Sequence, residues 1–224
     1  MLANPKAWIA LAAMAVVMAV LVFAAAGTVF FWRGWVFLGV FLAASAALTA
    51  DLAVRDPALL ERRFRGGPWA ETRPVQRIVM TIVSVGFVAL LAVPPLAWRN
   101  GWAPTSAVVS VAGDLLLALG YLAIHFVFRE NSFAAATVRV GEGQRVISTG
   151  PYAWVRHPMY AASLVYLIGM ALALGSWWGL VAVFAILPFL VWRLLDEERM
   201  LMGDLPGYRE YMQKMRWRLI PGLY

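Results

Sequence analysis

His157 and Glu197 stand at equal distances from a pair of tryptophans, each twenty residues from Trp177. Residues 158–192 between them carry no charged side chain, and one straight helix of that length would be roughly 50 Å long at 1.5 Å per residue. A bilayer's hydrocarbon core is only about 30 Å thick. The segment Gly175–Gly179, with its glycines, serine and interfacial tryptophans, predicts a turn. The chain then doubles back and brings His157 and Glu197 to the same membrane surface.

The chain around His157 has the features of a helix start that binds anions. Pro158 suits the first helical position, which makes His157 a candidate N-cap. The first-turn amides, together with the adjacent Arg156, suit a carboxylate or a phosphate group.

The second arm of the predicted hairpin ends in three acidic residues, Asp196, Glu197 and Glu198. Their oxygens can accept hydrogen bonds from a ribose diol or from an ammonium group. Arg193 lies one turn before Glu197 on the same helix face. Together, the two ends of the hairpin predict a site for a zwitterion.

These residues also carry a family resemblance. Gly150-Pro151-Tyr152 and Arg156-His157-Pro158-Met159-Tyr160, followed about forty residues later by Glu197-Glu198, resemble the cofactor signature of the isoprenylcysteine carboxyl methyltransferase family. The segments Gly207–Tyr211 and Arg218–Tyr224 resemble the endings of its prokaryotic members. The resemblance covers residues 131–224, and the preceding segments match only in being hydrophobic.

The resemblance implies an S-adenosylmethionine pocket at the cytoplasmic side of the membrane. The residues it assigns to the cofactor are Gly150, Pro151, Tyr152, Arg156, His157, Pro158, Tyr160, Glu197, Glu198 and Tyr208. Arg193 matches a family arginine near the reacting centre, and Asn131 matches an asparagine that precedes the signature.

The acceptor stays open at this stage, between the carboxylate of a prenylcysteine-like molecule and the amine of a lipid. Arg193 could orient a carboxylate by paired hydrogen bonds, whereas an amine would need a base such as Glu130. Two other classes of function remain as alternatives: an NADPH-dependent reductase like the sterol reductases, and a non-catalytic membrane scaffold.

The composition predicts the elements that must position this site. The chain is 62% hydrophobic and 14% charged, too apolar for one soluble core of 224 residues. We therefore predict an all-α, polytopic transmembrane helical bundle with five to six membrane segments, the last two forming the hairpin. The apolar runs are residues 7–32, 34–50, 78–98, 105–128 and 158–192.

The arginines predict the orientation of this bundle. With both termini in the cytoplasm, 17 of 19 basic residues fall inside, and only Arg33 and Arg99 fall outside. This indicates a multi-pass protein of the cytoplasmic membrane, with its tryptophans at the outer interface. The basic residues on the cytoplasmic side then account for the net charge of +7, so no nucleic-acid partner is expected.

We divide the chain into residues 1–128, which hold the first four membrane segments, and residues 129–224, which hold the cofactor-binding region. Residues 55–77, with Gly66, Gly67 and Pro68, are predicted to be a flexible cytoplasmic connection. The chain has no cysteine, so no thiolate metal site or disulfide is possible, and no metal is expected.

Overall fold

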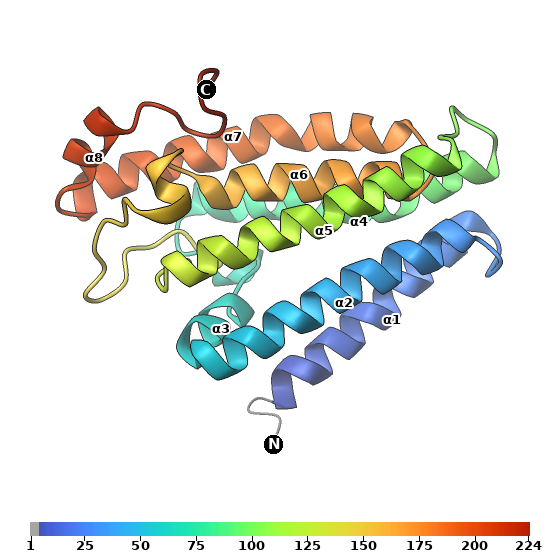
Figure 1. Ribbon diagram of the computed structural model, residues 1–224, viewed down its shortest axis with the longest axis horizontal. Coiled ribbons are helices and arrows are strands. Elements are labelled where there is room, and N and C mark those ends of the chain that lie inside the picture. Colours follow the sequence, from blue (N-terminus) through green and yellow to red (C-terminus); the bar gives the residue numbers. More distant parts are fainter. Residues whose placement is uncertain (1–4) are drawn as a thin grey trace.

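Five long apolar helices dominate the computed structural model, which describes residues 5–224 (Figure 1). Each is long enough to cross a bilayer, and their mean hydropathies lie between 1.9 and 2.8. They are α1 (Pro5–Ala26), α2 (Trp32–Arg55), α4 (Pro74–Arg99), α5 (Ala107–Glu130) and α7 (Trp178–Asp204). No β-strand occurs in the described residues, so the predicted all-α membrane bundle is confirmed.

The sixth apolar helix, α6 (Pro158–Ala173), is shorter than the others. Its 16 residues span roughly 24 Å, less than the hydrocarbon core. The predicted hairpin is confirmed, because α6 and α7 are joined by a short turn in which Gly175 has a φ of +91°. The α4–α5 connection holds this turn: Thr105 N donates to Gly175 O at 3.0 Å and Trp177 N donates to Ala103 O at 3.1 Å.

Glycines let α5 and α6 pack with their backbones in contact. A Cβ atom added at Gly169 would lie 2.4 Å from Leu117 N, and one at Gly113 would lie 2.4 Å from Ala173 N. Such close approach is typical of small residues at membrane helix interfaces. It fixes the start of α6, and therefore His157, relative to the end of α5.

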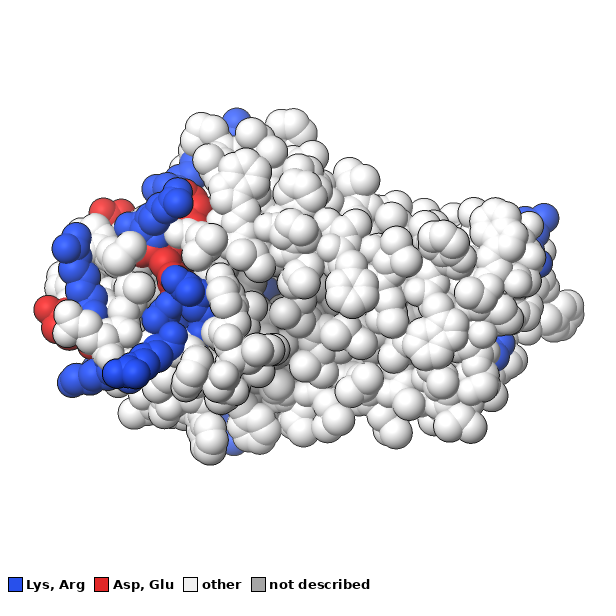
Figure 2. Space-filling model, turned by 90° about the horizontal axis from the view of Figure 1, so that it is seen from above, with Lys and Arg blue, Asp and Glu red and all other residues white. Residues whose placement is uncertain are grey.

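Most charged side chains lie at one end of the bundle, and five exposed tryptophans lie at the other (Figure 2). Lys, Arg, Asp and Glu gather at one end, which we call the charged end, while the middle of the molecule is white in Figure 2. Arg33 lies at the other end, where it donates to Thr105 O beside the α6–α7 turn. That end exposes Trp32, Trp35, Trp102, Trp177 and Trp178. This separation fits a bilayer between the two ends, and the placement of the charged end in the cytoplasm remains a prediction from the positive-inside rule.

The prediction that residues 55–77 form a flexible connection is wrong. This region contains helix α3 (Pro57–Phe64) and the 3-10 turn η1 (Pro68–Ala70). Asp56 caps α3 by accepting a 2.8 Å hydrogen bond from Leu59 N, and Pro57 takes the first helical position. Leu59 and Leu60 are buried, so the apolar side chains anchor α3 against the bundle.

Candidate functional site

The two ends of the α6–α7 hairpin meet at the charged end, as the spacing around Trp177 predicts. His157 Nε2 lies 3.1 Å from Glu198 Oε1. One turn into α6, Tyr160 OH donates to Glu197 Oε2 at 2.6 Å. The cationic helix start and the acidic segment of α7 are therefore in direct contact.

The anionic group bound at the start of α6 is the carboxylate of Glu198. Glu198 is 3% exposed and accepts hydrogen bonds from Arg156 Nε at 2.8 Å and from Arg218 Nε at 3.0 Å. The backbone amides of Arg156 and His157 donate to Trp217 O and Arg218 O. The Arg156 side chain, which the sequence assigned to a ligand anion, is thus engaged by Glu198, and the amides that precede α6 hold the carboxy-terminal segment against the hairpin.

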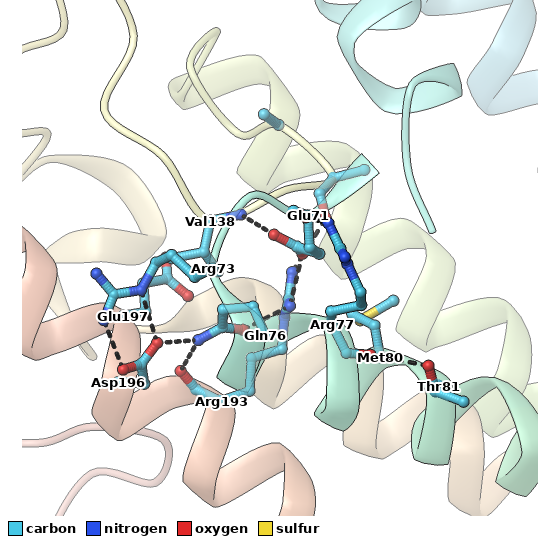
Figure 3. A network of polar contacts seen from close by, with 12 residues as sticks. Glu71, Arg73, Gln76, Arg77, Met80, Thr81, Val138, Arg193, Asp196 and Glu197 are labelled. Carbon is cyan, nitrogen blue, oxygen red and sulfur yellow. Dashed lines mark hydrogen bonds and ion pairs between the residues drawn. The ribbon is translucent and has the colours of Figure 1, made fainter. Parts of the chain in front are cut away.

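A second polar network ties α7 to the start of α4 (Figure 3). Arg193 Nη1 lies 2.7 Å from Glu71 Oε1 and donates to Gln76 Oε1 at 2.6 Å. Gln76 Nε2 donates to Asp196 Oδ2 at 2.6 Å, and Arg73 Nη2 donates to Asp196 Oδ1 at 2.7 Å. The hydrogen bond to Asp196 raises the pKa of Arg73. Two of the three acidic side chains at the end of α7 therefore neutralise arginines of the protein.

Sequence reasoning missed Glu71 and Gln76, although both are almost fully buried. Both lie in or beside a region expected to be flexible, where a single glutamate gives no signal. The pairing of Glu71 with Arg193 becomes visible only in the tertiary structure, where the α2–α4 connection packs on α7. Glu71 Oε2 also accepts from Val138 N at 3.2 Å, and Arg193 Nη2 donates to Ala136 O at 3.0 Å, so the network fixes the segment around Ala136.

A cavity of about 290 Å³ lies beside these networks, enclosed by α4, α6, α7, α8 (Tyr208–Lys214) and residues 131–147. Its volume is close to the lower end of the range for small-molecule sites, roughly 300–1,000 Å³. Nine of the predicted site residues line it: Asn131, Tyr152, Arg156, His157, Pro158, Tyr160, Arg193, Glu197 and Tyr208. Apolar side chains of the helices, including Phe87, Leu167 and Ile186, complete the wall.

Two polar groups on this wall are suited to a ligand. One carboxylate oxygen of Glu197 accepts a hydrogen bond from the Tyr160 hydroxyl, and the Glu197 side chain lines the cavity. The hydroxyl of Tyr208 is buried and has no hydrogen-bond partner among residues 5–224. A buried hydroxyl without a partner indicates a place where a bound molecule can complete the hydrogen bonding.

Four predicted site residues do not line the cavity: Glu130, Gly150, Pro151 and Glu198. Glu130 accepts a hydrogen bond from the Thr149 hydroxyl. Gly150 has a φ of +56°, and a Cβ there would lie 2.8 Å from the Glu130 carboxylate. A side chain at position 150 would therefore clash with the Glu130 carboxylate, and the positive φ also favours glycine there.

Asn131 positions the aromatic side of the cavity. Its Nδ2 donates to Tyr152 OH at 2.7 Å, while Tyr211 OH donates to Tyr152 O at 2.7 Å. Burial raises the pKa of Tyr152 to about 12, so its phenol stays neutral near pH 7. Asn131 thus acts on a tyrosine of the wall in addition to lining the cavity itself.

This geometry lies in a part of the chain that known proteins share. Residues 108–205 match the phospholipid methyltransferase family. The matched residues run from the first turn of α5 to the end of α7 and include Asn131, His157 and Glu197. The match covers less than half of the chain and agrees with the resemblance that the sequence showed.

The chain also has a curated relative. Over 154 residues the chain is 25% identical to the cobalt-zinc-cadmium resistance protein CzcN of Cupriavidus metallidurans. The alignment covers 68% of this chain and 62% of that protein, so the chain spans less than two thirds of the relative's length. Within residues 5–224, no group of three or more His, Cys, Asp or Glu side chains is placed to hold a metal ion.

Proposed function

We propose that this protein is an S-adenosylmethionine-dependent methyltransferase that acts on a lipophilic acceptor, with its cofactor cavity open to the cytoplasm. The observation that carries the proposal is the cavity at the charged end. Within the family-matched segment, it places Glu197 and Tyr160 on the same wall as apolar side chains of the membrane helices. A site of this composition suits a polar cofactor that meets an apolar acceptor at a membrane surface.

The residues on the wall fit the polar groups of S-adenosylmethionine. Glu197 would accept hydrogen bonds from a ribose diol or from the amino group. The buried hydroxyl of Tyr208 would gain the partner that it lacks in the protein. Tyr160 holds the Glu197 carboxylate toward the cavity, and Glu198 holds the start of α6 beneath it.

The cofactor, when bound, supplies a methyl group that is already activated for transfer. The protein then has to align the acceptor and keep bulk water away from it. Tyr152, Tyr160 and Tyr208 contribute aromatic surface to the cavity wall, and the network of Arg193 and Glu71 holds the segment around Ala136 over it. Arg193 is therefore a positioning residue in this proposal, since Glu71 already neutralises its charge.

Isothermal titration calorimetry of the purified, detergent-solubilised protein tests the proposal. Binding of S-adenosylhomocysteine, with no binding of NADPH, is the expected result. NADPH binding alone would support a reductase, and binding of neither would support a non-catalytic scaffold.

Two variants locate the ligand in the cavity. Glu197→Gln and Tyr208→Phe remove one charge and one hydroxyl from the wall, and both should weaken binding of S-adenosylhomocysteine by about tenfold. Glu210→Gln is the matched control, because Glu210 is exposed on α8 and does not line the cavity. Unchanged affinity in both wall variants would show that the cofactor binds elsewhere.

A further inference from the structure

A second cavity adjoins the first one, enclosed by α2, α3, α5 and α6. Its volume is about 330 Å³, and its wall is largely apolar, with Leu52, Leu60, Ile124 and Phe128 among the lining residues. Neither the family resemblance nor the composition of the sequence assigns a role to this space.

The two cavities share part of their walls. Arg63, Met159, Ser163 and Tyr166 line both of them. The shared residues come from α3 and from the first two turns of α6, close to Tyr160. Arg63 is the charged residue of this shared wall, so a molecule in the second cavity can contact its side chain.

Arg63 is half-buried and differs from the two buried arginines near the site. Arg193 is paired with Glu71 at 2.7 Å, and Arg156 is paired with Glu198 at 2.8 Å. Among residues 5–224, Arg63 has no carboxylate within ion-pair distance. Its Nη1 donates to Ala135 O at 3.0 Å, and its guanidinium lies 5.2 Å from the centre of the Phe128 ring.

The surroundings of Arg63 supply no carboxylate to neutralise its charge. Burial lowers the pKa of its guanidinium, and this effect outweighs the rise caused by Tyr166. A cation in such a place is stabilised by an anion that arrives with a ligand, because a guanidinium forms paired hydrogen bonds with carboxylates and phosphates. A cationic ligand group would instead be repelled by Arg63, whereas Arg193 is neutralised by Glu71.

We propose that the second cavity binds the apolar chain of an anionic amphiphile and that Arg63 binds its anionic group. The amphiphile is a single-chain carboxylate or phosphate ester drawn from the membrane, and its polar end lies where the two cavities join. The assignment of this molecule as the methyl acceptor rests on the proposed function, whereas the binding site itself does not. The positive charge of Arg63 also disfavours the amine acceptors that the sequence left open.

The test compares three probes with the same twelve-carbon chain: dodecanoate, dodecyl phosphate and dodecylamine. Binding to the full chain in nanodiscs of zwitterionic lipid is measured by calorimetry, with empty nanodiscs subtracted. We expect the two anionic probes to bind at least about tenfold more tightly than the amine, and the tighter of the two identifies the anion. Equal affinity for all three probes would overturn the proposal.

Substitutions at Arg63 test whether its charge causes the preference for the anionic probes. Arg63→Gln should remove the preference for anions, whereas Arg63→Lys should keep part of it, because the charge remains. Arg65→Gln is the matched control, since Arg65 ends the same helix, is exposed and pairs with Glu61. An unchanged preference in a folded Arg63→Gln variant would refute the role of Arg63.

A second variant tests the cavity without touching Arg63. Thr49 lines only the second cavity, so Thr49→Phe should fill it and weaken binding of both anionic probes by about tenfold while S-adenosylhomocysteine affinity stays unchanged. Unaltered probe binding in this variant would refute the cavity as the chain site. If the wild type binds the anionic probes but not S-adenosylhomocysteine, the proposed function fails and this binding site stands.

Discussion

Substitution by glutamine should affect different properties at the neighbouring residues Glu197 and Glu198. At Glu198 it should lower the stability of the protein, and at Glu197 it should lower the affinity for S-adenosylhomocysteine. Glu198 is 3% exposed and is bonded to Arg156, His157 and Arg218. Breaking a buried ion pair by removing one partner costs about 3–5 kcal/mol, because the other charge stays buried without compensation. Glu198→Gln keeps one carbonyl acceptor, so we expect a loss near the lower value, about 3 kcal/mol.

The effect can be measured by thermal unfolding in detergent, followed by the fluorescence of the 11 tryptophans. For a chain of this size, about 3 kcal/mol corresponds to a midpoint lowered by roughly 6–12 °C. Residues 215–218 should also become sensitive to protease, since Arg156 binds the carbonyl groups of Met215 and Arg216.

Glu197→Gln is the control for this experiment. Its only hydrogen-bonded partner in the described residues is the neutral hydroxyl of Tyr160, so its midpoint should stay within about 3 °C of the wild type. Its affinity for S-adenosylhomocysteine should fall instead. The reasoning is refuted if Glu198→Gln unfolds at the wild-type temperature, or if both variants lose the same stability.

Three further predictions concern other contacts. Arg193→Met and Glu71→Gln should each lower stability by about 3 kcal/mol, and the double variant should lose less than their sum, which a double-mutant cycle of unfolding free energies would detect. Gly169→Ala should cost about 1–3 kcal/mol by pushing α5 from α6, whereas Gly39→Ala, with nothing within 4 Å, should be neutral or slightly stabilising in the same assay. Because burial raises the pKa of Tyr152 from 10 to about 12, folding favours its protonated form, so its contribution is complete below pH 10 and is lost as the pH rises toward 12. A stability profile from pH 9 to 12 should therefore fall less steeply for Tyr152→Phe than for the wild type.

The sequence by itself determined the membrane bundle, the hairpin and the meeting of the two hairpin ends. Long apolar runs have one stable outcome in a bilayer, because helices satisfy every backbone hydrogen bond internally. The turn after α6 and the contact between His157 and the acidic segment of α7 followed from chain length, bilayer thickness and the turn residues Gly175–Gly179. Asp56 and Pro57 are also a sequence signal for the start of α3, which the prediction for residues 55–77 did not use.

Only the tertiary structure decided which charged groups neutralise each other and which remain on a cavity wall. Successive residues of a helix point about 100° apart, so Asp196, Glu197 and Glu198 face three different neighbours. Asp196 meets α4, Glu197 faces the cavity, and Glu198 meets the start of α6. The spacing of three consecutive acidic residues cannot assign these partners, because the partners are 20 to 123 residues away in the chain and are brought in by packing.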